Sequence, residues 1–157
     1  NLQQFVKSIN LCITNIYQAE IILIGRKPKL DISEINLIKN SIKSGKKVLC
    51  LNKDITFPTE KKDLPGNGAV VKMIEDDLKI NITSLGKPDI HFINYCSDFN
   101  YNFDYVIGDR VDTDIFFGNK INATSILVES GVKNYESSNF ADIKVKSFSD
   151  IVTVISR

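Results

Sequence analysis

The sequence predicts a mixed α/β protein built on a parallel, doubly wound sheet. Short runs rich in β-branched residues alternate with amphipathic helical patterns, which is typical of parallel strands joined by right-handed helical crossovers. Residues 105–108 form one such run, which ends in Gly108 and is followed directly by Asp109. Open α/β sheets bind ligands at the carboxyl ends of their strands, so the fold class also indicates where a site should lie.

Length and composition fit a globular chain of one or two small domains. The 157 residues are 43% hydrophobic and carry a formal net charge of +1, which gives no electrostatic reason to expect a nucleic-acid or membrane-surface partner. No apolar run approaches the roughly 20 residues that a membrane-spanning helix needs. Cys12, Cys50 and Cys96 form neither a zinc pattern nor a disulfide framework. Reduced thiols of this kind fit a cytoplasmic protein.

The first half of the chain predicts alternating helices and strands. Asp31 and Glu34 form a variant of the capping box, so a helix should begin there, and Gly45 is the expected end. A later helix should begin after Gly66-Asn67-Gly68 and turn Val70, Met73, Ile74 and Leu78 inward. We also expect a helix over residues 2–9 and strands over 11–14, 19–25 and 47–51.

The second half continues the alternation. A strand over residues 80–85 should end at Gly86-Lys87, with Pro88 at the first position of a short helix. His91 is the only histidine, and Cys96 diverges from it on that helix, so we expect no Cys–His nucleophile pair. Further strands are expected over 105–108, 124–129 and 143–145, with helices over 113–122 and 148–155, the last capped by Ser149 or Asp150.

Charged residues at two strand ends predict phosphoryl chemistry. Asp109 and Asp114 follow one strand, and carboxylates there suit a hard cation such as Mg²⁺. Lys87 follows another strand, and a lysine beside a bound cation neutralises charge on a transferring phosphoryl group. We therefore expect Lys87 and Asp109 to meet from neighbouring sheet edges.

Several segments resemble the haloacid-dehalogenase (HAD) phosphatases, and most closely their NagD-like branch of p-nitrophenylphosphatases and phosphoglycolate phosphatases. The core of that family is similar to Gly86-Lys87-Pro88, to residues 106–115 and to residues 124–132. Its cap is similar to residues 21–25, to Asn52-Lys53-Asp54 with Phe57-Pro58 after it, and to residues 65–69. The segments occur in the family's order and cover most of the chain.

This resemblance implies an organisation and a set of roles. Residues 1–80 would be part of an α/β cap, and residues 81–157 the C-terminal half of a Rossmann-like HAD core. The implied metal ligand for Mg²⁺ is Asp109, and the implied catalytic pair is Lys87 with Asp114, in which Asp114 holds Lys87 or a metal-bound water. Substrate contacts are expected from the following residues: Lys87, Arg110, Asn52 and Asp54. Members of the branch often dimerise through the cap, so a homodimer is also an expectation.

The chain departs from the family pattern at one essential feature. HAD phosphatases use an N-terminal Asp-x-Asp whose first aspartate attacks phosphorus, and no such motif precedes the cap segments here. Asp112-Thr113-Asp114 has that form but fits the later metal-binding motif. We therefore expect a phosphatase of small phosphorylated metabolites whose nucleophile lies upstream of Asn1, with this chain alone inactive.

Two alternatives remain. A non-catalytic HAD-like α/β binding module would keep the sheet and use the cap surface, although it would not need Lys87, Asp109 and Asp114 together. A response-regulator-like receiver needs its acidic pair before the lysine, whereas here Lys87 comes first. An apolar strand followed by Asp-x-Asp-Gly upstream of Asn1 would decide for the phosphatase.

Overall fold

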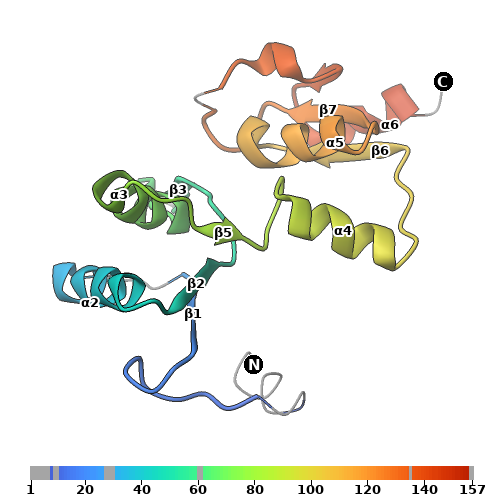
Figure 1. The fold of residues 1–157 in the computed structure, drawn as a ribbon. Coiled ribbons are helices and arrows are strands. Elements are labelled where there is room, and N and C mark those ends of the chain that lie inside the picture. Colours follow the sequence, from blue (N-terminus) through green and yellow to red (C-terminus); the bar gives the residue numbers. More distant parts are fainter. Residues whose placement is uncertain (1–7, 9–10, 27–30, 60–61, 135, 156–157) are drawn as a thin grey trace.

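The computed structural model describes residues 8, 11–26, 31–59, 62–134 and 136–155, and these form two α/β bodies. The first body holds the parallel sheet β1–β2–β5 and the second holds the parallel sheet β6–β7–β8. Figure 1 shows the two bodies one above the other, joined by the segment that runs from β5 through α4. The predicted α/β class with parallel strands is confirmed, but the strands divide between two sheets instead of forming one.

The first sheet packs one face against two helices. Its strands are β1 (Ile21–Ile24), β2 (Lys47–Cys50) and β5 (Thr83–Ser84), in parallel register. The helices are α2 (Ile32–Lys43) and α3 (Asn67–Leu78). The buried cluster between sheet and helices contains Ile24, Ile35, Ile38, Cys50, Val71, Ile74 and Ile82. Along β1 the side chains alternate, so Ile24 is buried while Ile21 and Leu23 are exposed on the other face.

Local signals at the helix ends explain where these helices begin. The Asp31 carboxylate accepts a hydrogen bond from the Glu34 N–H at 2.8 Å and caps α2, as the sequence predicts. Gly66 is the N-cap of α3, so the Gly-x-Gly segment opens a helix, as the sequence predicts. The expected inward position of Met73 is wrong, because its side chain is 50% exposed and Val71 takes the buried position.

A small hairpin and a linking helix lie between the two sheets in the chain. Strands β3 (Thr56–Phe57) and β4 (Leu64–Pro65) pair antiparallel. β3 follows the turn after β2, and β4 leads through Gly66 into α3. Helix α4 (Ile90–Asp98) follows β5 and is capped by Asp89, which accepts a hydrogen bond from the His91 N–H. The expected place of Pro88 at the first position of this helix is wrong, because Pro88 precedes the helix by two residues.

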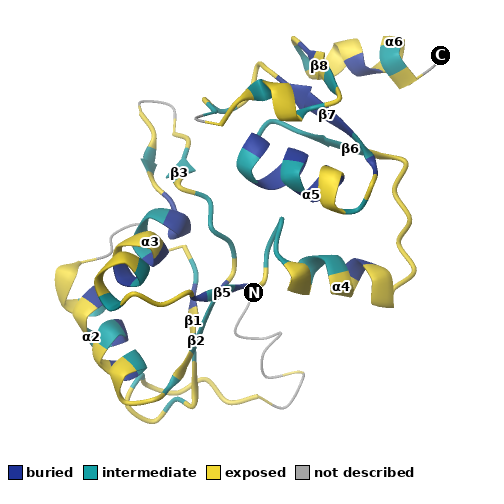
Figure 2. Cartoon of the chain, turned by 45° about the horizontal axis from the view of Figure 1, so that its top comes forward, coloured by how far each residue is buried: buried dark blue, intermediate teal, exposed yellow. Residues whose placement is uncertain are grey.

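The second body contains the most deeply buried strand of the protein's described part. Its strands are β6 (Tyr105–Gly108), β7 (Thr124–Val128) and β8 (Ile143–Val145), with β7 in the centre. A π-helical turn (Val111–Ile115) runs into α5 (Phe116–Lys120), and Ile151 of the closing helix α6 (Ile151–Ile155) packs beneath the sheet. Figure 2 shows β7 and the adjoining turns of α5 in the colours of buried and intermediate residues.

Some predicted elements differ from the structure at their ends. Residues 11–15 are irregular, so the short strand expected there is wrong. The last helical segment begins after Ser147, whose hydroxyl and N–H both contact the Asp150 carboxylate, so the expected cap at Ser149 or Asp150 is wrong. The helix expected over residues 2–9 lies largely outside the described residues. Within the described part of the chain, no helix is both long and apolar enough to cross a membrane.

Candidate functional site

An ion pair between Lys87 and Asp114 forms the centre of the candidate site. The Lys87 Nζ lies 2.5 Å from Asp114 Oδ1, and the side chain of Asp114 is only 10% exposed. The second oxygen of Asp114 accepts the backbone N–H of Arg110 at 3.2 Å. This confirms the contact expected between Asp114 and Lys87. It also shows how the π-helical turn, which carries Asp114, returns that carboxylate to the end of β6.

Asp109 occupies a different part of the same loop. Its Oδ2 accepts a hydrogen bond from the Val132 N–H at 3.1 Å, and no ion pair joins it to Lys87 in the described part of the chain. We had expected the two residues to come from neighbouring edges of one sheet. This is wrong, because Lys87 follows β5 of the first sheet and Asp109 follows β6 of the second. Lys87 instead reaches the second body through Asp114, so the link between the amine and the β6 loop is indirect.

The turn after β7 supports the backbone beside Asp109. The Asn134 side-chain amide donates to the Asp109 carbonyl at 2.8 Å, and its oxygen accepts the Val111 N–H at 2.7 Å. A Cβ placed on Gly131 would lie 2.1 Å from the Asp109 Cβ, so only glycine allows this close approach. Sequence reasoning missed Asn134, for which the available signal was a Gly-Val-x-Asn turn directly after a buried strand.

Arg110 crosses from this loop to the hairpin of the first body. Its Nε and Nη2 donate to the two carboxylate oxygens of Asp112 at 3.2 and 2.9 Å. Its Nη1 donates to the carbonyl and hydroxyl of Thr56 at 3.3 and 3.4 Å. Burial disfavours the charged guanidinium, but the Asp112 hydrogen bonds and the nearby carboxylates raise the pKa of Arg110 above its usual value.

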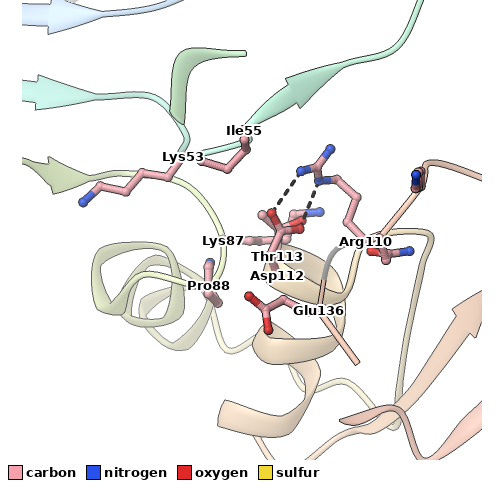
Figure 3. A pocket seen from close by; sticks show the side chains of 10 residues that line it. Lys53, Ile55, Lys87, Pro88, Arg110, Asp112, Thr113 and Glu136 are labelled. Atoms are coloured by element: carbon pink, nitrogen blue, oxygen red, sulfur yellow. Dashed lines mark hydrogen bonds and ion pairs between the residues drawn. The ribbon is translucent and has the colours of Figure 1, made fainter. Parts of the chain in front are cut away.

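A cavity of about 230 Å³ opens beside these residues. Figure 3 shows Lys53 and Ile55 on one side of it and the Arg110–Asp112 pair on the other. Ile55 and Pro88 are the apolar residues of its lining, and the remaining lining residues are Lys53, Lys87, Arg110, Asp112, Thr113, Lys133, Asn134 and Glu136. Two of the predicted site residues, Lys87 and Arg110, therefore line this cavity, whose lining residues are mostly polar or charged.

The turn after β2 brings the predicted cap residues near this cavity. The Asn52 Oδ1 is buried and has no hydrogen-bond partner among the described residues, and Asn52 lies against Gly86, next to Lys87. Burial raises the pKa of the neighbouring Asp54, against the lowering effect of the Arg110 guanidinium. Lys53, between them, is held by Glu75 at 2.7 Å.

The donor chemistry of the site fits part of a Mg²⁺ centre. Mg²⁺ takes hard oxygen ligands and is usually held by one or two carboxylates, together with waters and substrate phosphate. Asp109 offers such a carboxylate at the end of β6, with one oxygen already engaged by Val132. Across the described ranges no group of three or more His, Cys, Asp or Glu residues could hold an ion. Asp109 alone therefore fits as one ligand of an incomplete set.

The histidine and the buried cysteine of α4 form no site of their own. Cys96 is 6% exposed and His91 is exposed to solvent, so the two side chains diverge on the helix, as the sequence predicts.

Comparison with protein families and curated proteins identifies phosphatases. Residues 84–151 match the HAD-hydrolase-like family. An acid sugar phosphatase of Staphylococcus epidermidis is 27% identical, and the match covers 98% of this chain and 61% of that protein. An acid sugar phosphatase of Staphylococcus aureus is 26% identical over 80% of this chain and 50% of its own length. The chain thus spans about three fifths of the length of the first of these relatives.

Solved structures agree in fold with the whole of both bodies. A p-nitrophenyl phosphatase from Archaeoglobus fulgidus superposes with a TM-score of 0.77 at 22% identity, over 96% of this chain and 62% of that one. A glycerol phosphate phosphatase from Mycobacterium tuberculosis, solved in complex with calcium, gives a TM-score of 0.69 at 26% identity, over 84% of this chain and 40% of its own. Sequence and structure together confirm the resemblance: the chain has the fold of the HAD phosphatases and is similar to acid sugar phosphatases and p-nitrophenyl phosphatases.

Proposed function

We propose that this chain is the cap-and-core part of a Mg²⁺-dependent phosphomonoester hydrolase. The observation that carries the proposal is the Lys87–Asp114 ion pair beside the polar cavity. In this ion pair, the nearly buried carboxylate of Asp114 holds the ammonium group of Lys87 in a fixed place at the end of the first sheet. Such preorganised charge is what stabilises a transferring phosphoryl group.

Each residue of the site has a proposed part. Lys87 screens the charge of the substrate phosphate, and Asp114 positions its amine. Asp109 would be a ligand of Mg²⁺, which when bound would neutralise further charge on the phosphate. Asn52 and Asp54 would contact the substrate from the cap side.

The nucleophile would come from outside these 157 residues. In the intact enzyme, a carboxylate from an upstream Asp-x-Asp would attack phosphorus to form an aspartyl phosphate, which water would then hydrolyse. We propose accordingly that residues 1–80 serve as part of the cap and residues 81–157 as half of the core. The first sheet continues to Ser84, so the structural junction lies a few residues beyond 80.

The lining of the cavity suits a small, polar phosphorylated metabolite. Eight of its ten lining residues are polar or charged, and about 230 Å³ accommodates only a small ester. Relatives are named for sugar phosphates, glycerol phosphate and p-nitrophenyl phosphate. The free thiols of Cys12, Cys50 and Cys96 suit a cytoplasmic enzyme, which cell fractionation would test.

Hydrolysis of p-nitrophenyl phosphate tests this function. We expect turnover from the chain extended by its encoded upstream residues, loss of turnover with EDTA, and no turnover from the 157 residues alone. Asp109→Asn in the extended protein should lower turnover roughly 100-fold or more, because a bound metal contributes several kcal/mol. Asp98→Asn, on the exposed end of α4, is the matched control.

The possible results separate the two hypotheses. Turnover that Asp109→Asn leaves at the level of the Asp98→Asn control would exclude the metal role. Binding of phosphate by the extended protein without any hydrolysis would favour the non-catalytic module.

We also propose that two copies pair through the open face of the first sheet. Ile21 and Leu23 are 53% and 42% exposed there, opposite the face that α2 and α3 cover. Contiguous exposed apolar residues of this kind mark interaction surfaces. Sedimentation velocity should show a dimer that Leu23→Lys converts to a monomer, and an unmodified protein that sediments as a monomer would contradict the proposal.

A further inference from the structure

Arg110 was expected to contact substrate, but its surroundings indicate another role. We propose that Arg110 is a positioning residue, which holds the β3–β4 hairpin against the loop that carries Asp109 and Asp114. The inference deepens the proposed function and rests on it, because the cavity wall that Arg110 sets is that of the same site.

The first observation is that each nitrogen of the guanidinium already donates a hydrogen bond within the protein, and four of its five N–H groups are used. Nε and Nη2 form a two-pronged contact with Asp112, and Nη1 donates to Thr56, which is 54 residues away in sequence. The Arg110 side chain is 13% exposed. A phosphate or carboxylate of the substrate could therefore form a two-pronged contact here only by displacing existing hydrogen bonds.

The second observation is that the other contacts of the hairpin lie within the first body, where the Gly66 and Gly68 N–H groups donate to the carbonyls of Ile55 and Asp54 at 2.8 Å each. Each of its strands has two residues, and a two-stranded hairpin is marginally stable on its own. From its other side the guanidinium of Arg26 stacks on the Phe57 ring, 3.4 Å from the centroid. Arg26 and Arg110 thus contact successive residues of β3. Among the described residues, the hydrogen bonds of Arg110 are the ones that link this strand to the second body.

The position of the hairpin matters to the site. Ile55, directly before Thr56, lines the cavity together with Lys53. Asp54 lies close enough to Arg110 for the guanidinium charge to lower the pKa of its carboxyl, against the effect of burial. Release of Thr56 from Arg110 would let this wall move away from Lys87. The guanidinium therefore sets the distance between the residues that would contact the substrate and those that would contact the phosphate.

Amide hydrogen exchange measured by NMR tests the proposal in a way that does not depend on activity. Arg110→Met should raise exchange roughly tenfold or more at the hairpin amides, because hydrogen bonds to a charged group are lost. The amides of β7 should keep their protection. Arg110→Lys should not restore protection, since an ammonium cannot bridge Asp112 and Thr56 at once. Lys72→Met, which breaks the exposed Lys72–Asp76 pair, is the control and should change neither region.

Two results would overturn the proposal. One is unchanged exchange in the hairpin of Arg110→Met, and the other is full protection in Arg110→Lys. If Arg110→Met unfolds, fast amide exchange across β7 would reveal it. The proposal is then tested by proton exchange of Arg110 in the unmodified protein. There the Arg110 Nη1–H signals, which belong to the nitrogen that donates to Thr56, should exchange slowly. Exchange at the rate of a free arginine would reject the contact with the hairpin.

Activity provides a separate readout. In a hydrolysing protein, Arg110→Lys should raise KM more than it lowers kcat, because the cap-side wall moves while Lys87 stays paired with Asp114. If no hydrolysis is found in any form of the protein, the proposed function fails, yet the exchange experiment still decides the role of Arg110.

Discussion

Replacement of Lys87 by methionine should abolish most phosphatase activity of the intact enzyme. Lys87 lines the cavity, and its amine is fixed by the nearly buried Asp114. Removal of one preorganised group that stabilises transition-state charge typically costs about 10²- to 10³-fold in kcat. We expect a loss of that size for Lys87→Met in p-nitrophenyl phosphate turnover, with the amount of folded protein checked by circular dichroism.

A second effect of the same change needs its own control. Lys87→Met leaves the Asp114 carboxylate without its cation, which should lower the free energy of unfolding by about 1–3 kcal/mol. The double variant Lys87→Met, Asp114→Asn removes that unpaired charge, so stability should recover while activity stays lost. Turnover in Lys87→Met equal to that of Lys72→Met would show that the lysine has no part in the reaction.

Sequence reasoning placed the ends of the strands that carry the candidate site because the signals there are local. Gly108-Asp109 follows a β-branched run and Gly86-Lys87 follows another, so both sites could be placed without knowledge of the tertiary structure. The cap of α2 by Asp31 was equally predictable, since it depends on a partner three residues away. Segments whose structure is determined within a few residues were therefore the ones predicted most accurately.

Features that depend on distant partners were not predictable in this way. The pairing of β5 with β2 moves Lys87 into the first sheet, and no periodicity within residues 80–85 distinguishes that sheet from the other. Asn134 reaches Asp109 from 25 residues downstream, and Arg110 reaches Thr56 from 54 residues away. A polar residue in a loop is usually solvated, so its sequence context alone does not reveal such contacts.

The close approach of Gly108 to Asp114 leads to the second large effect. A Cβ built on Gly108 would lie 2.2 Å from the carboxyl carbon and 2.2 Å from Oδ2 of Asp114. Real side-chain contacts do not occur at such distances, so Gly108→Ala must displace a carboxylate that is held by Lys87 and by the Arg110 N–H. We expect the free energy of unfolding to fall by about 1–3 kcal/mol, as for other overpacked sites.

The same displacement should also remove activity, because the amine of Lys87 would lose its anchor. Gly25→Ala is the matched control, since its Cβ would meet only the flexible end of Leu51 at 3.1 Å. The Asp114 Cβ would also lie 2.3 Å from the new Cβ, so the clash is relieved only when Gly108→Ala is combined with Asp114→Gly. Chemical denaturation of that double variant should show partly recovered stability, while turnover stays low. If Gly108→Ala alone matched Gly25→Ala in both stability and turnover, the carboxylate of Asp114 could not occupy the position that links β6 to Lys87, and the proposed arrangement of the phosphate site would be wrong.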